Sequence, residues 1–164
     1  MKRRRRETWK LFAVLMVACA ALLGVFIFRD FAGEKESAAA FDEVKSAVFS
    51  QADLSAMKEA DEQMVKRLYG LNPADYEGFS LYYPSTNMGA EELLLVKLRD
   101  TSQMEDLKAA AENRVAAQKN SFEGYGVSQT ELLSNSVLDA RGNYLLLAVA
   151  ENAEALRRAF LQAL

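Results

Sequence analysis

The stretch Leu93-Leu94-Leu95-Val96-Lys97-Leu98 decides the fold of this 164-residue chain. A short, nearly continuous apolar run is typical of a strand that is buried on both faces of a sheet. The run Tyr144-Leu145-Leu146-Leu147 has the same character. Each run follows a shorter candidate strand and precedes a candidate helix, which makes a faint repeat of a ββα unit. We expect both runs to be central strands that point the same way, with the shorter strands at the edges and the two repeat helices on one face.

Apolar residues at helical spacing mark the other elements. The pattern predicts helices over 41–48, 54–68, 104–122 and after Asn152, with one further helical turn over 129–133. Ser102-x-x-Glu105 is a capping box at the start of the long helix. Alternation and turn residues predict the two shorter strands, over 79–83 and 137–140. The predicted fold class is α+β, in the order α-α-β-β-α-β-β-α, with a four-stranded mixed or antiparallel sheet packed by helices.

The N-terminal part of the sequence has the pattern of a membrane anchor. Residues 1–10 are basic, because six lysines and arginines stand against Glu7 alone. Residues 11–28 carry no charge, and as a helix they would span about 27 Å, close to the thickness of a bilayer core. We predict a transmembrane helix over 11–28. Because basic segments stay inside, residues 1–10 are predicted to be cytoplasmic and the C-terminal part extracytoplasmic.

Cleavage after export is the alternative. Met16-Val17-Ala18-Cys19 loosely resembles a lipoprotein signal, and Ala18-x-Ala20 loosely resembles a signal-peptidase site. Exported proteins normally turn polar after the cut, whereas residues 21–28 stay apolar. We therefore predict an uncleaved single-pass anchor, a linker over 29–40 and an extracytoplasmic domain over 41–164. Lipidation of Cys19 after cleavage stays open.

Composition excludes several classes of chemistry. The chain has no histidine, which removes Ser-His-Asp and Cys-His catalysis and histidine-ligated metals. Its single cysteine removes disulfide frameworks and multi-cysteine metal sites. We expect no metal and no cofactor. The first ten residues carry +5 of a total of −3, so the rest carries −8, and nucleic acid is a poor candidate partner.

Three groups of residues carry a resemblance to a known family. They are Ala90-x-Glu92 with Lys97 and Asp100, then Arg114-x-x-x-Gln118-x-x-x-Phe122-x-x-Tyr125, and Gly142-x-Tyr144 before the second apolar run. With them the sequence resembles a family of clostridial membrane-anchored and lipoprotein-type proteins, the domain of unknown function numbered 4358, over roughly residues 41–162. The resemblance implies an exported domain of a Gram-positive bacterium. It gives no catalytic residue.

Few residues are candidates for catalysis. Glu92 could act as a general base, and Asp100 and Asp139 could join it as oxygen ligands of a cation. The favoured interpretation of Glu92 is a charged residue at the start of a strand, and no cation-binding loop spacing is present. Ser102 has the position of a helix cap. The sequence therefore predicts no catalytic residue.

A binding role is favoured by the tyrosines. The loops 75–78 and 123–126 combine Tyr76, Glu77 and Tyr125 with glycines, and tyrosine gives rigid contact area with a polar tip. Arg114 and Gln118 share one face of the long helix and could form a polar anchor in a cleft. We expect a binding site from these five residues if the two loops meet at one end of the sheet. The alternative is that the rings pack over their own loops and that Arg114 bonds neighbouring carbonyls or carboxylates.

These features predict a membrane-anchored extracytoplasmic binding domain of the bacterial cell envelope. Its partner would be an envelope protein, a peptide or a glycan, and self-association through the sheet is a further option. The alternative function is a carboxylate-dependent hydrolase acting on an envelope glycan or peptide. That chemistry needs two carboxylates that face each other across a cleft, which sequence spacing does not establish.

Overall fold

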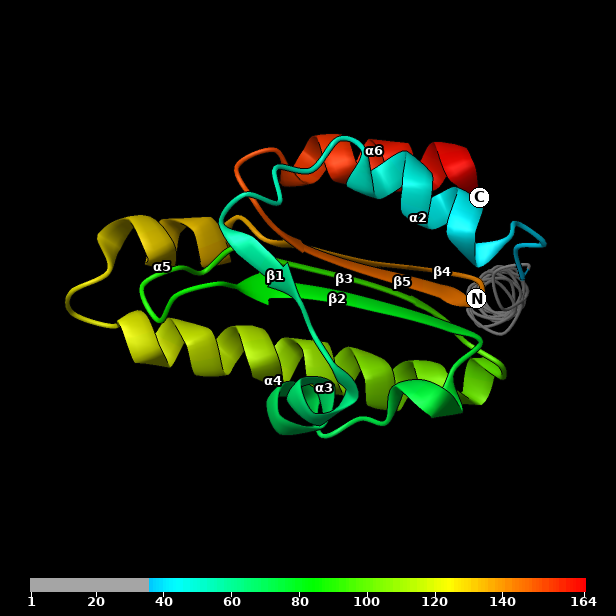
Figure 1. Ribbon diagram of the computed structural model, residues 1–164, viewed down its shortest axis with the longest axis horizontal. Helices are drawn as coiled ribbons and strands as arrows, with labels where there is room; N and C mark the ends of the chain where they lie inside the picture. Colours follow the sequence, from blue (N-terminus) through cyan, green and yellow to red (C-terminus); the bar gives the residue numbers. More distant parts are fainter. Residues whose placement is uncertain (1–35) are drawn as a thin grey trace, which may run out of the picture. The chain divides into compact units, whose positions relative to one another are not determined.

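Residues 36–164, which the computed structural model describes, fold into a sheet with helices on both faces (Figure 1). In chain order the elements are α2 (Phe41–Phe49), β1 (Met57–Glu59), α3 (Glu62–Tyr69), η1 (Pro73–Asp75), β2 (Gly78–Pro84), β3 (Glu92–Lys97), η2 (Thr101–Gln103), α4 (Met104–Phe122), α5 (Val127–Ser134), β4 (Val137–Arg141), β5 (Tyr144–Val149) and α6 (Ala153–Ala163). The fold class α+β is confirmed.

The two apolar runs lie side by side at the centre of the sheet. The strand order is β1-β2-β3-β5-β4, and every neighbouring pair is antiparallel. β3 and β5 pair over six residues, with Leu95 opposite Leu146. All residues of both strands are buried, as predicted for strands that are covered on both faces.

Alternate residues of the central strands enter two separate cores. Leu94 and Val96 of β3 face the core that is closed by α3, α4 and α5. Leu93 and Leu95 face the opposite core, which is closed by α2 and α6. Figure 1 shows the two helical layers, with α2 and α6 on one side of the sheet and α3 and α4 on the other. Each strand therefore stabilises the fold by burying both of its apolar faces.

Two predictions about the sheet are wrong: it has five strands and not four, and β3 and β5 run in opposite directions. Of the two predicted sheet types, mixed or antiparallel, the structure has the antiparallel one. The two repeat helices, α4 and α6, also cover opposite faces. The reason is that α2 already lies beside α6, so each face receives its own set of helices.

The predicted second helix over 54–68 is also corrected. Its first part is the edge strand β1, in which Met57 pairs with Pro84 and Glu59 with Tyr82. The helix α3 begins only at Glu62, because the Asp61 carboxylate accepts a hydrogen bond from the Met64 amide at 2.8 Å and caps it. It ends at Gly70, whose φ of +71° suits a residue without a side chain.

The long helix α4 begins at Met104, as predicted, but the predicted capping box is wrong, because the 3-10 turn η2 precedes the helix and is the element that is capped. Asp100, and not Ser102, is the capping residue: its carboxylate accepts from the Ser102 amide at 2.8 Å, and Gln103 completes the box. At the last helix, Asn152 occupies the predicted cap position, but its side chain donates to the Gln51 carbonyl instead.

No helix within residues 36–164 is long and apolar enough to cross a bilayer. The basic segment 1–10, the predicted transmembrane segment 11–28 and Cys19 all lie outside the described residues.

Candidate functional site

Arg114 and Gln118 point from α4 to the first residue of β3, the buried Glu92. Arg114 Nη2 lies 2.6 Å from Glu92 Oε2, and its Nε lies 3.1 Å from both carboxylate oxygens. Gln118 Nε2 donates to Glu92 Oε2 at 2.9 Å. The hydroxyl of Tyr69, on α3, donates to Glu92 Oε1. A carboxylate that is 1% exposed is thus held by donors from two helices.

The electrostatics of this cluster follow from burial. Burial raises the pKa of Tyr69 well above its usual value, and the charge of Glu92 beside it raises that pKa further. Burial alone would lower the pKa of Arg114, but the hydrogen bonds and the charge of Glu92 outweigh it and raise the pKa. Tyr69 therefore stays neutral and Arg114 charged, and the cluster joins β3 to α3 and α4.

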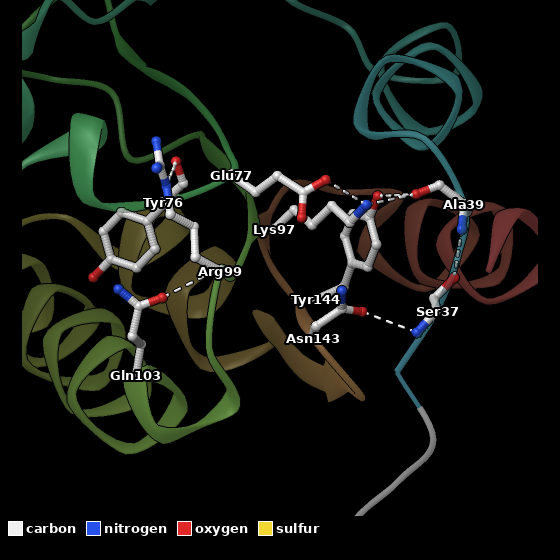
Figure 2. Close-up of polar contacts among 9 residues, drawn as sticks. All are labelled: Ser37, Ala39, Tyr76, Glu77, Lys97, Arg99, Gln103, Asn143 and Tyr144. Carbon is white, nitrogen blue, oxygen red and sulfur yellow. Dashed lines mark hydrogen bonds and ion pairs between the residues drawn. The ribbon is translucent and has the colours of Figure 1, made fainter.

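Tyr76 is buried, only 7% exposed, and its ring packs against Phe79 with the centroids 5.5 Å apart. Its backbone carbonyl accepts from Arg99 Nε at 3.0 Å (Figure 2). The carbonyl of the preceding residue, Asp75, accepts from Gln103 Nε2 at 3.1 Å. Burial raises the pKa of Tyr76, and the charges of Asp75 and Asp106 add to the effect. Tyr76 is therefore a packing residue of its loop.

Glu77 forms an ion pair with Lys97, the last residue of β3, at 2.7 Å (Figure 2). Lys97 is buried, while the side chain of Glu77 is half exposed. The pair lies at the end of β3 opposite to Glu92. Both ends of this strand therefore carry a buried charge with a partner, and the two charges face opposite sides of the sheet.

Tyr125 is the one residue of the five with an exposed ring, at 64%. Its hydroxyl donates to the Ser121 carbonyl, and its ring lies 6.0 Å from that of Phe122. It lines an open groove of about 630 Å³ at the corner between α4 and α5. The groove is also lined by Lys119, Asn120, Phe122, Glu123, Gly124, Gly126, Val127, Thr130, Glu131 and Ser134.

The five predicted residues do not form one site. The loop with Tyr76 is bonded to residues just before α4, and Tyr125 follows the end of that helix. A helix of 19 residues is about 28 Å long, so the two loops lie at opposite ends of the described domain (Figure 1). The expectation that they meet is wrong, because α4 spans the whole length of the sheet.

The carboxylates considered for a cation site are also kept apart. Glu92 begins β3, Asp100 follows its end, and Asp139 lies on the edge strand β4. Asp139 is occupied by Arg157 at 2.5 Å and by Arg141 at 2.9 Å. Over residues 36–164 no three acidic, cysteine or histidine residues are grouped in a way that could hold a metal ion.

Two exposed residues near Tyr125 were missed by the sequence reading. Val127 is 81% and Met88 is 63% exposed, and the Met88 carbonyl accepts from Gln129 Nε2 of α5 at 3.1 Å. Met88 thus belongs to the same end of the molecule. The sequence offered a weak signal, since Met88 precedes Gly89 in a loop and Val127 follows Gly126 at the start of α5. Their grouping depends on the tertiary fold.

The comparisons with known proteins support a family but no activity. The model of the family described as Domain of unknown function (DUF4358) matches residues 50–150, more than half of the chain. The chain belongs to this family, which confirms the resemblance that its motifs carry. No curated protein and no solved structure matches it.

Proposed function

We propose that this protein is a membrane-anchored extracytoplasmic domain that binds a polypeptide segment of an envelope protein in the groove at Tyr125. The observation that carries the proposal is the exposed apolar surface of Met88, Tyr125 and Val127 at one end of the molecule, referred to below as the distal patch. The other exposed large apolar residue of the described chain, Leu161, lies on α6 and is 39% exposed.

Exposed apolar side chains that gather at one place are typical of interaction surfaces. Each of the three residues would gain free energy on contact with apolar partner atoms, at about 25 cal/mol per Å² removed from water. The groove beside them has the polar rim that accompanies such surfaces, with Lys119, Asn120 and Glu131 among its lining residues. A partner could therefore place an apolar side chain against the patch and satisfy its main-chain groups at the rim.

The chemistry of the patch favours a polypeptide over a glycan. Sugars stack on flat aromatic rings, and of the three residues only Tyr125 offers one. Val127 and Met88 are aliphatic, and they gain most from an apolar side chain. The rim carries both signs of charge, which matches a polypeptide better than a polyanion.

The proposed anchor rests on the basic segment 1–10 and the uncharged segment 11–28 of the sequence. The segment that leads into α2 lies at the end of the described domain away from the turn between α4 and α5 (Figure 1). An anchor over 11–28 would therefore leave the patch free to meet a partner. The alternative, a carboxylate-dependent hydrolase, would have to use Glu123 and Glu131, the two carboxylates of the groove, because Glu92 is buried and bound by three side chains.

A binding screen tests the proposal. The full chain in detergent micelles is offered a random peptide library displayed on phage and, separately, soluble peptidoglycan glycan fragments. We expect selection of peptides with apolar anchor residues. Tyr125→Ala and Val127→Ala should each weaken the affinity for a selected peptide at least five-fold, about 1 kcal/mol, as for anchors at the centre of an interface.

Leu161→Ala is the matched control, because it removes an exposed apolar side chain from a different surface. It should leave peptide affinity unchanged. Binding of glycan fragments instead of peptides would overturn the choice of partner. Peptide binding that Tyr125→Ala and Leu161→Ala weaken equally would remove the distal patch as the site. Cleavage of a glycan or peptide that Glu123→Gln with Glu131→Gln abolishes would favour the hydrolase.

A further inference from the structure

Residues 36–40, which precede α2 and were predicted to be part of a linker, are bonded to the folded domain. The Ser37 amide donates to Asn143 Oδ1 at 2.9 Å, and the Ser37 hydroxyl donates to the Leu164 carbonyl at 3.1 Å. The Ala39 amide in turn donates to the Ser37 hydroxyl at 3.2 Å. The segment thus crosses from the β4–β5 turn to the end of α6 (Figure 2).

The Ala39 carbonyl is the best-held group of this segment. It accepts from Lys97 Nζ at 3.1 Å and from the Tyr144 hydroxyl at 2.8 Å, so both of its lone pairs are used (Figure 2). Lys97 is 7% exposed, and a buried ammonium needs such acceptors. Its other partners are the Glu77 carboxylate at 2.7 Å and the ring of Tyr144, 5.6 Å away.

The backbone just after the segment is fixed by close packing. Phe41 begins α2, and its ring lies over Gly78 at the start of β2. A Cβ atom at Gly78 would lie 2.2 Å from this ring, so only glycine lets the ring approach so closely. The chain is therefore held at Ser37, at Ala39 and again at Phe41.

We infer that residues 36–40 form a latch, which Lys97, Tyr144 and Asn143 clamp onto the end of the sheet. The latch makes these residues part of the rigid domain and fixes where the N-terminal segment leaves it, at the end opposite to the distal patch. It leaves seven residues, 29–35, as the connection to the predicted membrane segment, and an extended chain of that length reaches about 24 Å at most. The domain would then be connected to the membrane segment by these seven residues and not by the twelve residues of the predicted linker, 29–40.

The latch has a specific chemistry. Asn143 accepts a hydrogen bond from the main-chain amide of Ser37. Lys97 and Tyr144 donate to the main-chain carbonyl of Ala39. These contacts involve the backbone of the segment, and of its side chains only the Ser37 hydroxyl takes part. The inference does not depend on the proposed binding function, because every group that makes the latch belongs to this chain.

Hydrogen exchange of the full chain in detergent micelles tests the latch. The amides of Ser37 and Ala39 should exchange at least about ten-fold more slowly than in an unfolded chain, because both are donors in hydrogen bonds. Asn143→Ala should abolish the protection of Ser37. Tyr144→Phe removes a single hydroxyl and keeps the buried ring, and it should speed exchange at Ala39 several-fold.

The controls separate the latch from general loss of stability. The amides of Leu94 and Leu146, in the two central strands, should keep their protection in Tyr144→Phe and Asn143→Ala. Lys97→Met should release the latch, whereas Lys45→Met, which removes an exposed lysine paired with Glu59 at 3.5 Å, should not. Unprotected Ser37 and Ala39 amides in the parent chain would overturn the latch. So would unchanged protection at both amides in Asn143→Ala and Tyr144→Phe.

Discussion

The carboxylate of Glu92 shows what a single buried charge demands of its surroundings. Moving an ionised carboxylate out of water costs several kcal/mol, and the cost is met only if the charge is paired and its lone pairs are used. Arg114 supplies the opposite charge, and Tyr69 and Gln118 supply further donors. Removing one of these donors should cost more free energy of unfolding than its hydrogen bond contributes, because the buried charge is left without that partner.

Arg114→Met should therefore lower the free energy of unfolding by about 3–5 kcal/mol, since it leaves the Glu92 charge buried without its partner. Urea unfolding followed by circular dichroism measures this change. Adding Glu92→Gln to Arg114→Met removes the unmatched charge and should recover part of the loss. Arg67→Met, at an exposed position of α3, serves as the matched control. A loss below about 1 kcal/mol in Arg114→Met would contradict the role given to this pair.

The sequence indicated only half of this cluster. The shared face of Arg114 and Gln118 follows from helical spacing, and both were predicted to be polar residues of one site. Their partner Glu92 lies 22 residues before Arg114, and nothing local joins the two. The pairing depends on how α4 crosses the start of β3. Tyr125 is exposed in its loop between Gly124 and Gly126, and its binding role stays a prediction.

Among the elements, β3 and β5 carry the largest share of the packing. Leu95 and Leu146 are fully buried and lie opposite each other in the core that α2 and α6 close. If either side chain is shortened, the neighbouring side chains cannot fill the space that it leaves unless the surrounding structure shifts. They are therefore the most sensitive positions for a change in side-chain volume.

Leu95→Ala or Leu146→Ala should each lower the free energy of unfolding by about 2–5 kcal/mol, from lost burial and the cavity that remains. The measurement is the midpoint of urea unfolding. Leu161→Ala, at an exposed position, should change stability by no more than about 0.5 kcal/mol. A variant at either buried position that unfolds at the same urea concentration as the parent would show that its strand is not central.

Sequence periodicity predicted most elements and failed at β1. Leu54, Met57, Ala60, Met64 and Leu68 have helical spacing, yet Met57 lies in a strand. The strand is stabilised by backbone hydrogen bonds to β2, which is distant from Met57 in the sequence. The helix begins only after Asp61, which caps it. Strand direction and the face that each helix covers were likewise set by contacts between distant segments. Local patterns hold no information about such contacts.

For the whole molecule, the decisive question is which side of the membrane the domain occupies. We expect protease added to intact protoplasts to digest the domain, while a tag at the N-terminus stays protected, because the basic segment is predicted to remain in the cytoplasm. Lysed protoplasts, in which the tag must also be lost, give the control. Protection of the domain in intact protoplasts would reverse the topology, and a diacylglyceryl group on Cys19 would contradict the uncleaved anchor.

The family match covers less of the molecule than the fold requires. It runs over residues 50–150, whereas α2 and α6 lie outside it and cover one entire face of the sheet. Without them Leu93, Leu95 and Leu146 would be exposed on that face. The flanking helices therefore belong to the folding unit of this chain.

The packing of α2 against α6 has a consequence for how the protein folds during its synthesis. During synthesis α2 leaves the ribosome about 100 residues ahead of α6. Until α6 has emerged, α2 lacks the helix beside which it packs. The sheet face between them cannot close early, since closing such a long loop requires the late segment to be present. A nascent chain of this design stays open until its last helix has been made. For the export proposed above, an open chain is the form that a narrow translocation channel can pass.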